Sequence, residues 1–147
     1  MKDARDKVER VLATIEAFWA AYDAGDPGFF DFFTADAVIF SLSFPIRLRG
    51  PEAYRRYFGP EFTSESRATQ ILHPEVILVG EGALVTSQNR VRVNYRSVDS
   101  RTTLLLVPNG DALKVAHLHM SPLLIPSPAD GRGLVEEVAA IAAPADR

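Results

Sequence analysis

The spacing of the hydrophobic residues changes its period once along this chain. In the first segment they recur three and four positions apart, which predicts one apolar stripe on a helix: Val8, Val11, Leu12, Ile15, Phe18, Trp19 and Tyr22. From residue 73 onward, apolar and polar residues alternate instead, as in strands with two different faces. Helices followed by a run of antiparallel strands predict an α+β fold with the helices on one side of a sheet.

Turn-forming residues divide the chain into the expected elements. Gly25, Pro27 and Gly28 end the first helix, and a short, almost wholly buried helix is expected at 29–33. A Gly-Pro pair begins a third helix within 49–62. We predict strands at 36–43, 73–79, 83–98, 101–107 and 112–121, with an Asn-Gly hairpin turn within 108–111. The folded domain is expected over 1–125, followed by a Pro/Gly-rich linker and a short helix over 126–147.

The composition argues against several classes of partner. Hydrophobic residues make up 47% of the chain and charged residues 24%, which is typical of a globular domain. A net charge of −3 gives no electrostatic reason to expect nucleic acid or an anionic membrane as a partner. The chain has no cysteine, its charged N-terminus does not resemble a signal peptide, and its longest apolar run, 104–107, is too short to span a membrane. We therefore expect one soluble, cytoplasmic domain.

Four short segments carry a resemblance to a known superfamily. "AAYDAGD" ends the first helix, "FTADAVIF" opens the first strand, and "ILHPEVILVGEGA" and "VAHLHMS" form two later strands. With this order of elements, residues 5–122 resemble the nuclear transport factor 2-like superfamily. The chain is similar to the association domain of calcium/calmodulin-dependent kinase II, and the SnoaL-like polyketide cyclases and ketosteroid isomerases share the fold. The resemblance implies a cone-shaped, curved antiparallel sheet around three N-terminal helices, a central pocket, and homodimers that meet through their sheets.

His117 and His119 stand two positions apart in the last predicted strand and therefore share a face. They could be ligands of a metal, a catalytic pair or ordinary strand residues. A metal site needs three or four converging ligands, and the remaining histidine, His73, has no paired carboxylate motif beside it. The resemblance favours strand and interface residues, with Ala116, Leu118 and Met120 on the pocket side instead. We expect no metal and no other cofactor.

The resemblance to ketosteroid isomerases allows a test for acid–base chemistry. Those enzymes use an aspartate base, with a tyrosine and a protonated aspartate as oxyanion donors. Here the three positions fall on Ser41, Phe18 and Thr102, and none supplies the required group. Whether the chain is an enzyme stays open; if it is, a cyclase, isomerase or lyase is expected. The catalytic candidates are Tyr22, Asp36 and His119, although aspartate at the head of a strand commonly caps or turns the chain.

Arginines on a central strand are the most informative feature. Within 83–98, one predicted face carries Val91, Val93 and Tyr95, and the other carries Gln88, Arg90, Arg92 and Asn94. A charge on a central strand must reach solvent or be paired. The resemblance puts Arg90 inside the pocket, where a guanidinium would bind a carboxylate or phosphate. The alternatives are that Arg90 pairs with an internal acidic residue and that Arg92 lies at the wet rim of the sheet.

The rest of the pocket is expected to be aromatic with a few polar groups. In a cone fold the core and the pocket lining are one surface, so aromatic residues on a helix can be core alone. The predicted ligand is a small anionic or aromatic molecule. The predicted ligand-binding residues are Arg90, Phe18, Tyr22, Tyr57, Phe58, Gln88, Arg92, Thr102 and Met120.

Three functions remain open at this stage. The favoured one is a SnoaL-like small-molecule-binding domain with an arginine-anchored apolar pocket, non-catalytic or weakly catalytic, because the acid–base residues are missing. The second is a cyclase, isomerase or lyase of small-molecule metabolism. The third is an oligomerisation domain that resembles the kinase association domains, without a kinase role. Members of one fold perform unrelated functions, so the resemblance alone does not decide among them.

Overall fold

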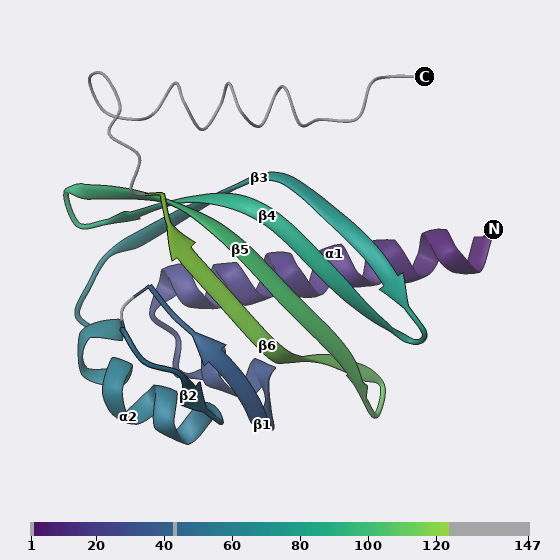
Figure 1. The fold of residues 1–147 in the computed structure, drawn as a ribbon, viewed down its shortest axis with the longest axis horizontal. Coiled ribbons are helices and arrows are strands. Elements are labelled where there is room, and N and C mark those ends of the chain that lie inside the picture. Colours follow the sequence, from purple (N-terminus) through teal and green to yellow (C-terminus); the bar gives the residue numbers. More distant parts are fainter. Residues whose placement is uncertain (1, 43, 124–147) are drawn as a thin grey trace.

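The computed structural model describes residues 2–42 and 44–123. Within them the chain is α+β, with a curved, unclosed sheet of six strands and the helices on one side (Figure 1). The helical elements are α1 (Lys2–Ala24), the 3-10 helix η1 (Pro27–Phe32) and α2 (Pro51–Phe62). The strands are β1 (Phe33–Phe40), β2 (Leu48–Arg49), β3 (Arg67–Val79), β4 (Gly82–Val93), β5 (Arg96–Asn109) and β6 (Ala112–Pro122).

The apolar stripe predicted for α1 is the face that packs into the core. Its buried members, each at most 5% exposed, are Val11, Ile15, Phe18, Trp19 and Tyr22. The helix ends at Gly25, which has φ +64, a conformation that residues with a Cβ rarely adopt. A Cβ at this position would lie 2.9 Å from the carbonyl oxygen of Phe62. The close approach of the two chain segments brings the end of α1 beside the end of α2.

The sheet is ordered β2-β1-β6-β5-β4-β3. Strands β3 to β6 pair antiparallel through consecutive hairpins, while β1 pairs parallel with β6. The expected antiparallel sheet therefore contains one parallel pair. A parallel pair needs a crossover, because both strands run the same way. Here the chain leaves β1 and passes through β2, α2 and then β3, β4 and β5 before it reaches β6.

Burial along β4 defines the two faces of the sheet. Val85, Asn89 and Val91 are buried and lie on the face that meets the helices, which we call the inner face. Gln88 and Arg90 lie between them in sequence and belong to the opposite, outer face, because successive side chains of a strand alternate.

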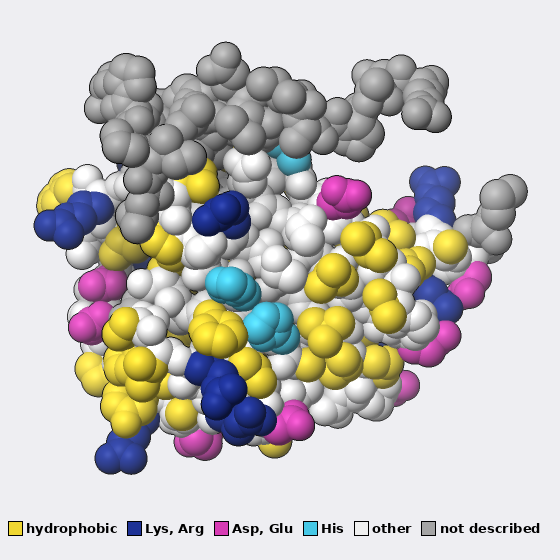
Figure 2. Space-filling model, viewed as in Figure 1, with side chains coloured by type: hydrophobic (Ala, Val, Ile, Leu, Met, Phe, Trp, Pro, Cys, Tyr) yellow, Lys and Arg dark blue, Asp and Glu magenta, His cyan; other side chains and the backbone are white. Residues whose placement is uncertain are grey.

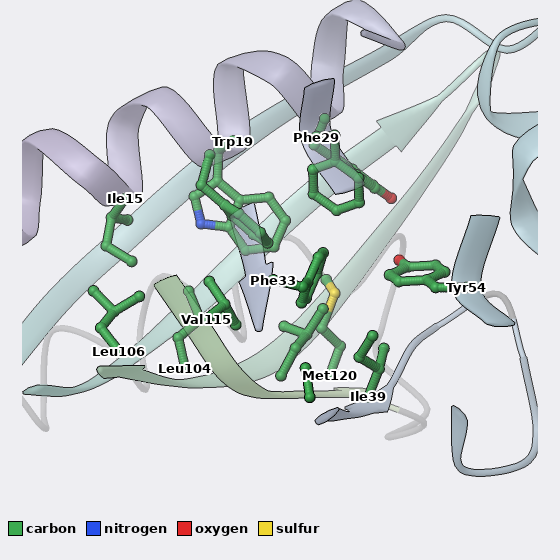
Figure 3. Close-up of a cluster of buried hydrophobic side chains, with 14 of the residues drawn as sticks. Ile15, Trp19, Phe29, Phe33, Ile39, Tyr54, Leu104, Leu106, Val115 and Met120 are labelled. Atoms are coloured by element: carbon green, nitrogen blue, oxygen red, sulfur yellow. The ribbon is translucent and has the colours of Figure 1, made fainter. Parts of the chain in front are cut away.

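The aromatic residues of the helices and of β1 form one cluster against the inner face. The ring of Phe29 contacts six other aromatic rings, those of Phe18, Tyr22, Phe30, Phe33, Tyr54 and Phe62. Figure 3 shows Trp19 and Phe29 on one side of this core and the aliphatic side chains of β5 and β6, such as Leu104 and Val115, on the other. The cluster forms the core between the helices and the sheet.

The structure confirms the expected helices and the last hairpin, and it corrects several strands. The first strand is β1 (Phe33–Phe40) and not 36–43, β2 was not predicted, and β3 begins at Arg67. The predicted strand 83–98 is two strands, because Val93 pairs with Arg96 across a two-residue turn and Asn94 has φ +55. Tyr95 lies in that turn and is fully exposed. Residues 126–147, predicted as a linker and helix, lie outside the described residues. None of the helices in the described part of the chain combines the length and apolar content needed to cross a membrane.

Candidate functional site

A cavity of about 450 Å³ lies between the helices and the inner face of the sheet. One wall is aromatic and consists of Tyr22 from α1 and Phe58 from α2, with ring centroids 6.3 Å apart. The opposite wall is aliphatic and consists of Val91 and Val93 from β4 and Val98 from β5. We call this space the inner cavity.

The polar groups of the inner cavity come from its rim. Glu61 and Glu65 lie at the end of α2 and in the turn after it, while Asn94, Tyr95 and Arg96 come from the turn between β4 and β5. Two carboxylates against one guanidinium do not make a positively charged site. The rim therefore gives no electrostatic preference for an anion.

Arg67 supports the aromatic wall from behind. Its side chain is 0% exposed, and its guanidinium carbon lies 5.1 Å from the ring centroid of Tyr22, 5.4 Å from that of Phe58 and 4.6 Å from that of Phe62. The guanidinium donates to the backbone oxygens of Tyr22 and Phe62 and pairs with Glu65 at 3.3 Å. This buried charge is thus fully partnered and joins the ends of α1 and α2.

Tyr22 is a titratable aromatic group in the wall of the inner cavity. Burial raises the pKa of its phenol to about 12, although the charge of Arg67 opposes the shift. The hydroxyl is therefore protonated at neutral pH and can donate a hydrogen bond. Burial also raises the pKa of Tyr54, whose hydroxyl hydrogen-bonds to Ser41.

The structure does not place Arg90 in the inner cavity. Arg90 lies opposite Asp99 on the outer face, and its Nε is 2.9 Å from Asp99 Oδ1. The predicted placement of Arg90 among the aromatic side chains is wrong, because its neighbour Val91 occupies that side of the strand. The alternative, that Arg90 pairs with a carboxylate, is confirmed by this contact.

Arg92 shares the outer face with Arg90. The two arginines line a separate cavity of about 260 Å³ together with Gln70 and Ser97. Gln88 also lies on the outer face, beside Thr103, in a further cavity. A ligand bound by these side chains would not touch the aromatic wall, so the predicted set does not form one site.

The other predicted ligand-binding residues fall into two groups. Phe18, Thr102 and Met120 are buried and do not line the inner cavity, and Thr102 lines the separate cavity that contains Gln88. Tyr57 is half exposed and packs on Phe44, with ring centroids 4.9 Å apart. Of the two residues predicted as alternatives for this wall, Phe58 is the one that lines the inner cavity.

The three catalytic candidates do not come together. Tyr22 lines the inner cavity, whereas Asp36 is exposed on β1 and accepts a hydrogen bond from Thr34 Oγ1 at 3.1 Å. His119 is exposed on the outer face, where its ring centroid lies 5.3 Å from that of Phe40. Tyr22, Asp36 and His119 therefore cannot act together on one substrate.

The outward orientation expected of the paired histidines is confirmed. His117 and His119 lie on the outer face, while Leu118 and Met120 are buried on the inner face. Nδ1 of His117 is 2.9 Å from the backbone oxygen of Val38, which ties β6 to β1. Within 2–42 and 44–123 there is no group of three or more His, Asp or Glu side chains that could hold a metal ion.

Sequence reasoning missed Arg67, Glu61 and Glu65, three residues in or beside the inner cavity. The predicted strand began at His73, but β3 begins at Arg67. The alternation of Arg67, Thr69 and Ile71 on one side of β3 was the available signal, because an arginine in phase with core residues must have buried partners. The rim carboxylates Glu61 and Glu65 gave no such signal.

The comparisons with known proteins identify the family. Residues 11–126 match the family model of the SnoaL-like domain. The chain belongs to the SnoaL-like domain family. The resemblance to the nuclear transport factor 2-like superfamily is thereby confirmed, together with the cone fold. A search of curated proteins finds no match for this sequence.

Solved structures similar to this SnoaL-like domain have names from three functional classes. A candidate dehydratase of the NTF2-like family from Streptomyces avermitilis has a TM-score of 0.72 at 18% identity, covering 82% of this chain and 99% of that one. A candidate calcium/calmodulin-dependent protein kinase II association domain from Xanthomonas campestris has a TM-score of 0.71 at 19% identity, covering 79% and 87%. A candidate ketosteroid isomerase from Parabacteroides distasonis has a TM-score of 0.63 at 17% identity, covering 78% and 86%. At these identities the likeness shows the fold alone.

Proposed function

We propose that this SnoaL-like domain binds a small, mainly apolar or aromatic molecule in the inner cavity. The observation that carries the proposal is the pair of facing walls, Tyr22 and Phe58 against Val91, Val93 and Val98, around about 450 Å³. Ligand sites are commonly about 300–1,000 Å³ in volume, with apolar lining and few polar groups. The cavity therefore has the size and chemistry of a small-molecule site.

The lining favours a neutral ligand over an anionic one. Arg90, the predicted anchor for an anion, is on the other face of the sheet, and the rim of the inner cavity carries Glu61 and Glu65 beside Arg96. An anion would approach Glu61 and Glu65, while the guanidinium of Arg67 is already paired with Glu65 and Arg96 is exposed. Of the two ligand classes predicted from the sequence, the aromatic class is the one we retain for this cavity.

The test is binding of 2-ethylnaphthalene, a neutral aromatic probe, measured by isothermal titration calorimetry and by thermal shift. We expect saturable binding and a raised melting temperature, since a ligand that binds the native state alone stabilises it. Val98→Trp fills the inner cavity and should abolish both effects. The matched control, Val107→Trp, adds the same ring to the outer face of the same strand and should preserve them. Absence of binding by the wild type to this probe and to related neutral aromatics would overturn the proposal.

A second candidate function is a lyase or isomerase reaction in the same cavity. It is favoured by one observation: the protonated phenol of Tyr22 and the carboxylates of Glu61 and Glu65 line one space. A proton donor and a carboxylate base are the groups that such reactions require. Incubation of the bound compounds with the protein, followed by mass spectrometry, tests for turnover. Turnover that persists in both Tyr22→Phe and Glu65→Gln would contradict these roles.

We further propose that two copies associate through the outer face. This face carries apolar side chains, among them Phe40 at 37% exposed, Ile77 at 47% and Val79 at 57%. Figure 2 shows hydrophobic side chains gathered on this face, next to histidines. One similar structure is named as an association domain, which supports an assembly role.

The oligomeric state in solution tests the proposed association of two copies. Sedimentation equilibrium should give a dimer for the wild type and a monomer for Phe40→Glu combined with Ile77→Glu. Ile46→Glu is the control, because Ile46 is 59% exposed but precedes β2 and lies outside the outer-face set. A monomeric wild type would contradict the assignment.

A further inference from the structure

The inner cavity brings aromatic rings and carboxylates to one space. Tyr22 and Phe58 form its aromatic wall, and a third ring, that of Tyr95, lies at the rim. Glu61 and Glu65 line the same rim from the end of α2 and the turn after it. Aromatic faces attract cations through their negative quadrupole, and carboxylates attract them through their charge. Together these groups favour an organic ammonium group.

The rings of the aromatic wall already hold one cation. The guanidinium carbon of Arg67 lies 5.1 Å from the ring centroid of Tyr22 and 5.4 Å from that of Phe58. Both distances are within the range of about 6 Å in which a cation is attracted to an aromatic ring. Because Arg67 is fixed behind the wall by buried contacts, it leaves the cavity side of the rings to a ligand.

The charges at the rim are not all paired within the protein. Glu65 pairs with Arg67 at 3.3 Å, so these two charges compensate each other. Glu61 is exposed, and within residues 2–42 and 44–123 its carboxylate forms no ion pair. Arg96 is also exposed at the rim and would attract an anion instead. Glu61 and Arg96 therefore favour opposite charges on a ligand, and a test has to separate their effects.

Tyr95 presents its whole ring to solvent at the rim, with an exposed fraction of 103%. The backbone of its turn is held in place, because the Asn94 N–H donates to the backbone oxygen of Ser66 at 2.9 Å and the Ser66 N–H donates to Asn94 Oδ1 at 3.3 Å. The ring can therefore turn about its side-chain bonds while the turn stays fixed. A ligand at the rim gives this ring a surface to cover.

We infer that the inner cavity recognises an aromatic ligand that carries a basic amine, with the ammonium group at the rim between Glu61 and the ring of Tyr95. This inference rests on the proposed function, since it requires a ligand in the inner cavity. It adds a charged group to the mainly apolar ligand of that proposal, and it adds an orientation. The aromatic ring of the ligand lies against Tyr22 and Phe58, and the ammonium group stays at the rim because burying a charge deeper would be unfavourable.

The experiment compares three probes that share a naphthalene ring and differ in charge. At neutral pH, 2-(2-naphthyl)ethylamine is a cation, 2-propylnaphthalene is neutral and 2-naphthylacetate is an anion. Calorimetry should show that the wild type binds the amine about fivefold more tightly than the carboxylate, the size of an exposed ion pair. Added salt should weaken binding of the amine and leave that of the hydrocarbon unchanged or stronger, because salt screens exposed charges.

Glu61→Gln assigns the preference to one carboxylate, since it removes the charge and keeps the shape of an exposed side chain. It should weaken binding of the amine about threefold and change that of 2-propylnaphthalene by less than about 1.5-fold. Glu52→Gln is the matched control, because Glu52 is also on α2 and is 83% exposed but does not line the inner cavity. It should leave all three affinities unchanged.

Tyr95→Leu tests the third ring. It should weaken binding of the amine about threefold, the size of an exposed cation–π contact, and affect 2-propylnaphthalene less. Nuclear magnetic resonance of the bound amine should show the methylene protons beside its nitrogen shifted upfield in the wild type, and less so in Tyr95→Leu. Tyr57→Leu is the control, because Tyr57 is half exposed and packs on Phe44 outside the inner cavity.

The outcomes separate the inference from the proposed function. If none of the three probes binds, the proposed function fails and the inference fails with it. If 2-propylnaphthalene binds but the amine binds no more tightly than the carboxylate, the cavity binds ligands and the ammonium site is overturned. Tighter binding of the carboxylate would assign the charge preference to Arg96 and overturn it as well. So would a preference for the amine that is unchanged in Glu61→Gln.

Discussion

Arg90 and Asp99 lie opposite each other on the outer face of β4 and β5, with Nε of Arg90 2.9 Å from Oδ1 of Asp99. Their side chains are only 10% and 13% exposed. The arginine that the sequence suggests as a ligand anchor therefore joins two strands on the side away from the inner cavity. The ion pair on the sheet and the aromatic wall of the inner cavity therefore lie on opposite sides of the sheet.

Removing one partner of this pair should destabilise the protein without affecting the inner cavity. Arg90→Met leaves Asp99 partly buried beside an apolar side chain, so we expect a loss of about 1–2 kcal/mol in the free energy of unfolding. Urea unfolding measures it. Arg90→Met combined with Asp99→Leu should recover most of the loss. If Arg90→Met folds normally but binds 2-ethylnaphthalene more weakly than the wild type, the placement of Arg90 outside the inner cavity would be contradicted.

Arg67 should be far more important for stability than the exposed arginine on the outer face. Arg67→Met removes the donor to the backbone oxygens of Tyr22 and Phe62 and leaves them buried, which should cost about 2–4 kcal/mol. Arg92→Met is the matched control and should change stability by less than about 0.5 kcal/mol. Thermal and urea unfolding of the two variants provide the comparison. Equal effects would show that the buried contacts of Arg67 contribute little.

Tyr22 should make the protein sensitive to alkaline pH. Its pKa is 10.0 in an unfolded chain and about 12 in the fold, because burial disfavours the phenolate. Its contribution to stability is therefore complete below pH 10 and is lost as the pH rises towards 12, on the order of 1 kcal/mol by pH 11. Urea unfolding between pH 8 and about 11.5 should show a shallower loss in Tyr22→Phe than in the wild type. Parallel curves for the two proteins would contradict the shift.

Gly50 should tolerate alanine less well than Gly80. Both have positive φ, +81 and +58, but a Cβ on Gly50 would lie 2.7 Å from the backbone oxygen of Ala35, whereas nothing lies within 4 Å of one on Gly80. We expect Gly80→Ala to cost about 1 kcal/mol from its backbone conformation alone, and Gly50→Ala about 2–4 kcal/mol. Melting temperatures of the pair test the difference. A Gly50→Ala protein as stable as Gly80→Ala would mean that β1 and the start of α2 move apart freely.

Thr102→Val should stabilise the unliganded protein. The hydroxyl of Thr102 is buried with no partner in the described part of the chain, so replacing it with a methyl group removes an uncompensated desolvation cost. A gain of about 0.5–2 kcal/mol is expected in urea unfolding. Thr103→Val serves as control. A loss of stability in Thr102→Val would indicate that the hydroxyl already has a partner in the unliganded protein, such as a bound water.

The sequence predicted the elements better than it predicted the site. The stripe from Val11 to Tyr22 and the alternation in the later strands are local signals, and they identified α1, α2 and most of the sheet. Tyr22 and Phe58 were also predicted in the pocket and do line the inner cavity. Arg67, Glu61 and Glu65 were missed, because their positions depend on how the end of α2 meets α1, a contact between segments far apart in the chain.

What the sequence determined by itself is that β4 has two faces, with Val91 and Val93 on one and Arg90 and Arg92 on the other. What only the tertiary structure decided is which face meets the helices. A period of two divides a strand into two sets of side chains but does not say which set is covered. That depends on the elements packed against the strand, and here they bury Asn89 with the valines while leaving Arg90 to pair with Asp99 on the opposite side.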